Sequence, residues 1–311
     1  MSGIALSPIG TMVAVTAAIL IAATLLVILL RRLRPAKDFS ELSARIQSWW
    51  MMAGVFFAAI LVDSRVSLVF FAFLSFWALK EFVTLLETRA ADHRALFWAF
   101  LAVPVQYVLV GMGWYGMFVL FIPVYMFLFL PLRLVIAGEA AGFVRSASQI
   151  QWGLMAFVFG LSHLGYLLRF DEPLPGRGVD GRTLVLFLVF VTEMSDVLQY
   201  AWGKLLGRHK ILPTISPNKT WEGFVGGILS ASALSLLVRF LTPFSVWETL
   251  IVSLLICVVG FFGGAVMSAV KRDLGTKDFG SLIPGHGGVL DRVDSLCYSA
   301  PIFFHYVRYF H

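Results

Sequence analysis

Long apolar runs, each close to the length of a membrane-spanning helix, constrain this chain more than any other feature of its sequence. A helix needs about 20 residues to cross a bilayer. Ten candidate runs occur, at about residues 11–30, 47–62, 66–79, 95–111, 115–132, 151–168, 183–201, 222–240, 247–270 and 295–310. Only 14% of residues are charged and 59% are hydrophobic, whereas a soluble domain has about 25% charged residues. The sequence therefore predicts an all-α polytopic membrane protein with about ten transmembrane helices and short loops.

The distribution of positive charge predicts which loops face the cytoplasm. If the run 11–30 passes from outside to inside, alternation places 18 of the 24 Lys and Arg residues at the inner ends. Such an excess marks cytoplasmic loops. Positive charge follows this run rather than preceding it, which indicates a retained helix rather than a signal peptide. We expect a multi-pass inner-membrane protein with both termini outside and its reactive loops in the cytoplasm.

Residues with reactive side chains are unevenly distributed along the chain. Residues 1–150 are predicted to form N-terminal transmembrane helices that say little about chemistry. Within them, the apolar side chains of residues 38–50 recur at near-helical spacing among polar ones, which predicts a short helix on the cytoplasmic interface. Residues 151–311 are predicted to form a C-terminal catalytic region that carries two polar loops. Cys257 and Cys297 show neither metal spacing nor a disulfide framework, which favours packing roles.

The first informative segment lies at the end of the seventh run and in the loop after it. Glu193 and Asp196 are three residues apart, on one face of a helix, and ionisable residues within membrane helices are functional candidates. A buried pair bonded to neighbouring helices is the alternative. Further along, Ser216, Lys219 and Thr220 precede a predicted helix N-terminus, a suitable seat for phosphate. A basic loop resting on anionic headgroups explains the charge but not the hydroxyls.

The second segment, residues 268–295, is the densest in polar groups. Its 28 residues hold four acids, four Lys or Arg, one His and five glycines. Gly285, Gly287 and Gly288 allow close backbone approach and can turn amide N–H groups toward an anion. Their spacing does not match the Walker A phosphate-binding loop of P-loop nucleoside triphosphatases. The segment therefore predicts an anion site of another kind, and a salt-bridged cytoplasmic loop is the alternative.

Carboxylates and cations in this segment point to a metal–polyphosphate site. Asp291 and Asp294 are three residues apart and share one helix face. Together with Asp278 they are suited to Mg²⁺, which proteins bind through a few carboxylates plus substrate phosphates. Four cations are available to neutralise phosphate oxygens: Lys271, Arg272, Lys277 and Arg292. The positive charge is dispersed between apolar runs, so no nucleic acid polymer is expected as a partner.

These residues resemble the phosphatidate cytidylyltransferase (CDP-diacylglycerol synthase) family over about residues 190–300. The family signature reads here Ser268-x-x-Lys271-Arg272-x₄-Lys277-Asp278-x₅-Pro284-Gly285-His286-Gly287-Gly288-x₂-Asp291-Arg292-x-Asp294. A second family block resembles Ser216-Pro217-x-Lys219-Thr220-Trp221-Glu222-Gly223. The resemblance implies a homodimer that condenses CTP with phosphatidic acid in the bilayer, with Mg²⁺ as cofactor. The products would be CDP-diacylglycerol and pyrophosphate.

The resemblance and the side-chain chemistry together assign expected roles. The expected catalytic residues are Lys271, Arg272, Lys277, Asp278, His286 and Arg292. The expected substrate-binding residues are Ser216, Lys219, Thr220, Ser268, Gly285, Gly287 and Gly288. The expected metal ligands are Asp196, Asp278, Asp291 and Asp294. Because the lipid phosphate is already an anionic nucleophile, these groups would act mainly by neutralising charge and aligning the reactants.

Two departures from the family pattern fall in the expected site. Gly264 stands where the family usually has a metal-binding Asp, and Asp273 is nine residues away, about half a helical turn out of phase. The chain also has Asp196-Val-Leu-Gln-Tyr200 where the family commonly has Asp-x-Gly-Ala-Tyr. The departures indicate a divergent branch with altered metal coordination, a different lipid phosphate, or lost activity.

Three other functions stay open. The first is nucleotidyl or phosphoryl transfer to another lipid phosphate or a polyprenol. The second is a non-catalytic membrane relative, which Gly264 favours and the largely intact 268–294 segment disfavours. The third is a transporter, which Glu193 and Asp196 suggest. In a transporter, however, charged residues should lie at mid-membrane on several helices, whereas here they gather in loops.

Overall fold

A computed structural model describes residues 7–33, 38–170 and 179–311. Its helices are α1 (Pro8–Leu33), α2 (Ser40–Val62), α3 (Ser64–Thr84), α4 (Asp92–Met112), α5 (Tyr115–Leu120), α6 (Phe127–Ile136), α7 (Phe143–Gly153), α8 (Leu161–Leu167), α9 (Gly181–Leu206), α10 (Trp221–Ser235), α11 (Val246–Asp273), α12 (Leu290–Val293) and α13 (Leu296–Phe310). Irregular helical turns continue some of them: η1 (Phe121–Met126), η2 (Leu154–Gly160) and η3 (Leu236–Leu241). The two strands are β1 (Lys210–Leu212) and β2 (Ser216–Thr220).

The all-α polytopic membrane fold predicted from the apolar runs is confirmed. Within the described residues, nine helical stretches are long and apolar enough to cross a membrane, and they coincide with the first nine predicted runs. The tenth run, 295–310, corresponds to α13, whose 15 residues fall short of the roughly 20 that a span requires. The interface helix predicted at 38–50 is wrong, because α2 runs without a break from Ser40 to Val62.

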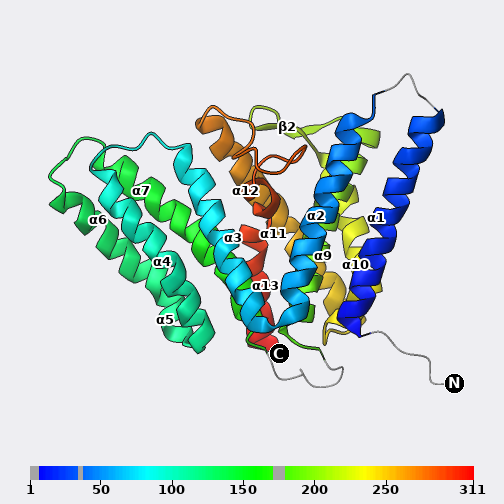
Figure 1. Ribbon diagram of the computed structural model, residues 1–311, viewed down its shortest axis with the longest axis horizontal. Coiled ribbons are helices and arrows are strands. Elements are labelled where there is room, and N and C mark those ends of the chain that lie inside the picture. Colours follow the sequence, from blue (N-terminus) through cyan, green and yellow to red (C-terminus); the bar gives the residue numbers. More distant parts are fainter. Residues whose placement is uncertain (1–6, 34–37, 171–178) are drawn as a thin grey trace.

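The polar loops gather at one end of the bundle. Figure 1 shows the α3–α4 turn, the α6–α7 turn, the β1–β2 hairpin and the loop before α12 at its upper end, and the C-terminus at the lower end. These upper loops are among those predicted to carry the excess of positive charge. The structure therefore brings both motif-bearing loops to the same end, although α10, η3 and α11 separate them in the sequence.

The short helix α13 lies in the centre of the bundle rather than on its surface. Phe303, Phe304 and Val307 are buried in the core, and Figure 1 shows α13 between the N-terminal and C-terminal helices. A side chain on Gly160 of η2 would approach the carbonyl oxygen of Cys297 to 2.5 Å. A glycine is therefore needed at position 160 for this contact. The central position of α13 places its N-terminal end, which follows Asp294, at the floor of the polar region.

Local sequence signals explain where three of the helices that contribute to the polar end begin. Asp180, Thr220 and Ser245 each accept a hydrogen bond from a backbone N–H group in the first turn of α9, α10 and α11, respectively. The Glu248 carboxylate accepts a hydrogen bond from the backbone N–H of Ser245, which completes a capping box. Such caps satisfy N–H groups that a helix start leaves without partners. Thr220 thereby fixes the point at which β2 passes into α10.

Candidate active site

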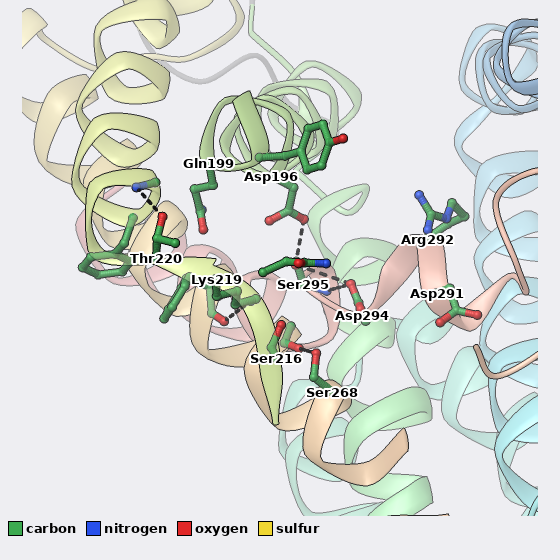
Figure 2. A pocket seen from close by; sticks show the side chains of 16 residues that line it. Asp196, Gln199, Ser216, Lys219, Thr220, Ser268, Asp291, Arg292, Asp294 and Ser295 are labelled. Carbon is green, nitrogen blue, oxygen red and sulfur yellow. Dashed lines mark hydrogen bonds between the residues drawn. The ribbon is translucent and has the colours of Figure 1, made fainter. Parts of the chain in front are cut away.

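A cavity of about 310 Å³ opens at the polar end, between α9, β2, the start of α10, α11 and the segment that joins α12 to α13. Figure 2 shows this cavity with its side chains. Eight of the residues predicted to bind substrate or metal, or to act in catalysis, line it: Asp196, Ser216, Lys219, Thr220, Ser268, Asp291, Arg292 and Asp294. The two predicted polar segments therefore meet in one place.

Two carboxylates converge on one hydroxyl at the floor of the cavity. Ser295 Oγ donates a hydrogen bond to Asp196 Oδ2 at 2.9 Å and lies 3.4 Å from Asp294 Oδ1. The backbone N–H of Ser295 also donates to Asp294 Oδ1, at 2.7 Å. Burial raises the pKa of Asp294 above its ordinary value, because desolvation disfavours the charged form. Asp196 on α9 and Asp294 before α13 thus form a close acidic pair.

Lys219 on β2 faces this acidic pair. Its Nζ donates to the carbonyl oxygen of Phe261 at 3.2 Å and lies 4.3 Å from the centre of that ring. Burial lowers the pKa of Lys219, and the charges of Asp196 and Asp294 oppose that shift. A Cβ on Gly264 would lie 3.2 Å from this Nζ and 3.4 Å from Ser295 Oγ. The position at which the chain departs from the family pattern therefore lies in the cavity wall.

Asp291 is held at the edge of the cavity by three donors. Lys271 Nζ lies 2.9 Å from Asp291 Oδ1, and only 14% and 2% of these two side chains are exposed. Asp291 Oδ2 accepts hydrogen bonds from the backbone N–H groups of Phe279 at 2.8 Å and Gly288 at 3.0 Å. In this arrangement the carboxylate organises the loop between α11 and α12. Its predicted role as a metal ligand stays a prediction, since Oδ1, which among the described residues accepts from Lys271 alone, keeps a free lone pair.

Other predicted residues lie outside the cavity lining. Arg272 donates to the carbonyl oxygens of Ile215 at 3.3 Å and Thr276 at 3.2 Å. Lys277 and Asp278 are exposed on the loop. Their predicted catalytic and metal-binding roles stay predictions, because the structure does not bring these side chains to the acidic pair.

His286 and the loop glycines are also away from the lining. The His286 ring meets the edge of Trp49 with centroids 5.9 Å apart, and burial lowers its pKa. Gly285 and Gly287 have φ values of +74° and +80°, a region that glycine enters without steric cost. Gly288 is buried in the same loop. These three glycines shape the turn before α12, and their predicted contact with substrate stays a prediction.

The acidic pair fits Mg²⁺ better than the full set of four predicted ligands does. No group of three or more His, Cys, Asp or Glu side chains suited to a metal occurs in the parts of the chain that the structure describes. Proteins often hold Mg²⁺ through one or two carboxylates, with phosphates and water completing the octahedron, and Asp196 with Asp294 matches that pattern. Over the same residues, the buried Nε of Arg292 has no hydrogen-bond partner. A phosphate oxygen in the cavity would suit this donor.

Comparison with known proteins shows the family of this chain. Residues 43–310 match the model of the cytidylyltransferase family. The chain belongs to this family. It is 43% identical over 294 residues to the uncharacterized protein YnbB of Escherichia coli K12, a match that covers 94% of this chain and 96% of YnbB.

Two cytidylyltransferases with a stated acceptor match a shorter part. The phosphatidate cytidylyltransferases of Staphylococcus haemolyticus and of Staphylococcus aureus strain COL are each 39% identical over 125 residues, 40% of this chain. The chain spans about half of their length, 48% in both cases. The family thus supports nucleotidyl transfer, while these partial matches bear on the lipid acceptor.

Some residues of this cytidylyltransferase cavity received no role from the sequence, among them Ser295, Phe261 and Gln199. Ser295 follows Asp294 directly and was within reach of the motif, but its bond to Asp196 depends on how α9 packs against α13. The contact of Phe261 with Lys219 involves a backbone carbonyl that no motif reveals. Gln199 also lines the cavity. The helix α10 approaches it closely, since a Cβ on Gly227 would lie 2.6 Å from the backbone N of Gln199. Glycine at position 227 therefore leaves room for Gln199.

Proposed function

We propose that this protein transfers the cytidylyl group of CTP to phosphatidic acid, giving CDP-diacylglycerol and pyrophosphate. The observation that carries the proposal is a cavity in which the Asp196–Asp294 pair faces Lys219 and Arg292 at the polar end of a membrane-spanning cytidylyltransferase. The relatives named phosphatidate cytidylyltransferases support phosphatidic acid as the acceptor.

The proposed reaction exchanges one phosphorus–oxygen bond for another. A phosphate oxygen of phosphatidic acid attacks the α-phosphorus of CTP, and the bond from that phosphorus to the bridging oxygen of the β-phosphate breaks. The bonding electron pair leaves with pyrophosphate. The nucleophile is already anionic, so the main barrier is repulsion between the two phosphate groups. No strong general base is required in the cavity.

The cavity residues supply opposite charges at separate points. Lys219 and Arg292 would bind phosphate oxygens and hold the two substrates in line. Asp196 and Asp294 would hold Mg²⁺, with the hydroxyl of Ser295 orienting both carboxylates. When bound, Mg²⁺ would supply positive charge to the phosphate oxygens. The bond from Ser295 keeps the two carboxylates close together, an arrangement that suits a bound cation.

The arrangement of the bundle supports a cytoplasmic active site in the inner membrane. The cavity opens at the end that carries the positively charged loops, and an excess of Lys and Arg favours the cytoplasmic side. CTP would enter from water at this end. Phosphatidic acid would present its phosphate from the adjacent leaflet.

Transfer of label from CTP into lipid tests the proposal directly. Purified full-length protein in detergent would receive dioleoyl phosphatidic acid, Mg²⁺ and CTP labelled at the α-phosphate. We expect labelled CDP-diacylglycerol and one pyrophosphate per turnover, both abolished by EDTA. Asp196→Asn should lower the amount of product about 100-fold, whereas Asp273→Asn, which changes an exposed acid at the end of α11, should retain it.

The acceptor is tested in the same assay. Undecaprenyl phosphate in place of phosphatidic acid should give no labelled lipid. Label on the polyprenyl phosphate alone would replace the proposed acceptor with another lipid phosphate. No label on either lipid, from protein that is folded and monodisperse, would favour a non-catalytic relative.

A further inference from the structure

A carboxylate from the N-terminal half of the chain holds the loop that leads into the cavity. Glu81, near the end of α3, is only 7% exposed. Its Oε1 accepts a hydrogen bond from the backbone N–H of Val289 at 3.0 Å, and its Oε2 accepts one from Leu290 at 2.8 Å. These partners are more than 200 residues away in the sequence. Both oxygens of one buried acid are therefore committed to the start of α12.

Two glycines of the loop make room for this carboxylate. A Cβ on Gly280 would lie 2.6 Å from Glu81 Oε1, and a Cβ on Gly288 would overlap the same carboxyl group. Neither residue is among the described glycines with positive φ. Lack of space, rather than backbone conformation, therefore requires glycine at both positions. For Gly288, whose sequence motif suggested phosphate binding, Glu81 is a sufficient explanation.

The segment held by Glu81 carries cavity residues. Asp291 and Arg292 lie in α12 and line the cavity, and Asp294 follows directly. A shift of α12 would move the unpartnered Arg292 Nε and one member of the acidic pair. Glu81 is not part of the cavity lining, so any effect it has on the reaction must act through α12.

A second contact from the N-terminal half supports the same loop. Ser48 on α2 donates through Oγ to the carbonyl oxygen of Pro284 at 2.7 Å. The neighbouring Trp49 ring contacts His286 edge to face. Helices α2 and α3 thus hold the loop at two points, one on each side of Gly287.

We propose that Glu81 is a positioning residue for cytidylyl transfer, and that Gly288 is a glycine because Glu81 requires the space. The catalytic part of the inference rests on the proposed function. The structural part concerns the loop alone and is measurable without turnover. An anionic acceptor with two backbone donors at the start of a helix is a favourable arrangement.

Amide hydrogen exchange tests the structural part. Loss of a hydrogen bond to a charged group should speed exchange of a peptide that covers Val289 and Leu290 by roughly ten- to a hundredfold in Glu81→Ala. Glu81→Gln, which keeps one acceptor, should fall between this variant and wild type. The matched control is Glu87→Gln, because Glu87 lies just beyond the same helix with 84% of its side chain exposed. Wild-type exchange in Glu81→Ala would overturn the proposal.

A double-variant cycle tests why position 288 is glycine. Gly288→Ala alone should clash with Glu81 and lower kcat by about tenfold or more. If Glu81 requires the space, Glu81→Ala with Gly288→Ala should be no worse than Glu81→Ala alone. If the two substitutions lower kcat independently, so that the fold losses multiply in the double variant, the glycine serves the substrate instead. That result would overturn this part.

The Mg²⁺ dependence separates positioning from general stability. Glu81→Gln should weaken binding at the Mg²⁺ site, which is measured with Mn²⁺ as a paramagnetic probe. The melting temperature of Glu81→Gln should stay equal to that of Glu87→Gln. A lower melting temperature with unchanged metal affinity would reduce Glu81 to a structural residue. If wild type shows no turnover, the proposed function fails while the exchange result still decides whether Glu81 holds the loop.

Discussion

The Lys271–Asp291 ion pair offers a sharp test of whether Asp291 organises the loop or binds the metal. The pair lies largely out of water, with 14% and 2% of the side chains exposed. Removing one partner of such a pair leaves an uncompensated charge, which costs about 3–5 kcal/mol. In Asp291→Asn the amide oxygen can still accept from the N–H groups of Phe279 and Gly288. We therefore expect the free energy of unfolding to fall by an amount near the lower limit, about 3 kcal/mol.

The other variants of the cycle follow from the same contacts. Lys271→Met leaves Asp291 with its two backbone donors, so we expect the free energy of unfolding to fall by about 2 kcal/mol. The double variant contains no unpaired buried charge and should be about as stable as Asp291→Asn alone. The resulting coupling is about 2 kcal/mol, within the range for residues in direct contact. An exposed pair would give less than about 1 kcal/mol.

Thermal unfolding in detergent, followed by tryptophan fluorescence, would measure the cycle, with a Mg²⁺ titration of turnover beside it. If Asp291 organises the loop, Asp291→Asn lowers the melting temperature, and Lys271→Met in the same chain causes little further loss. An unchanged melting temperature together with loss of the Mg²⁺ response would refute this reasoning. Asp291 would then be a metal ligand, as its place in the motif predicts.

The cavity floor leads to three further predictions. Asp196→Asn and Asp294→Asn each remove one member of the acidic pair and should lower turnover about 100-fold; an unaltered Mg²⁺ titration would contradict their metal role. Lys219→Met keeps the apolar contact with Phe261 but removes the charge, so the KM for CTP should rise about tenfold, and an unchanged KM would exclude phosphate binding by this lysine. Gly264→Asp adds a carboxylate beside Lys219 and the acidic pair, so Mn²⁺ should bind about tenfold more tightly; equal affinity would show that the added group does not reach the ion.

Much of the fold follows from local sequence. A helix inside a bilayer must satisfy its own backbone hydrogen bonds and keep apolar side chains toward lipid, so each span leaves a continuous apolar run. That is why nine runs coincide with nine long helices of the described chain. The last run has a second reason to be apolar, because α13 packs inside the bundle. It is surrounded by other helices, and burial in protein selects the same residues as contact with lipid.

Part of the candidate site also follows from spacing along the chain. The carboxylates at 291 and 294 were placed together by helical periodicity, and the hydroxyls at 216 and 220 by their position before a helix. Asp278 and Lys277 share the motif with them but do not line the cavity. Motif membership does not distinguish a side chain that enters a cavity from one on the outer face of the same loop, because both occupy similar loop sequence.

The sequence by itself determined the membrane-spanning class, the two reactive segments and the chemistry that their residues favour. Only the tertiary structure decided which groups meet. It joins Asp196 to Ser295, 99 residues later, and Glu81 to the start of α12. The physical reason is that contacts between helices depend on how their faces pack and on where glycines allow close approach. Those distances have no counterpart in spacing along a single chain.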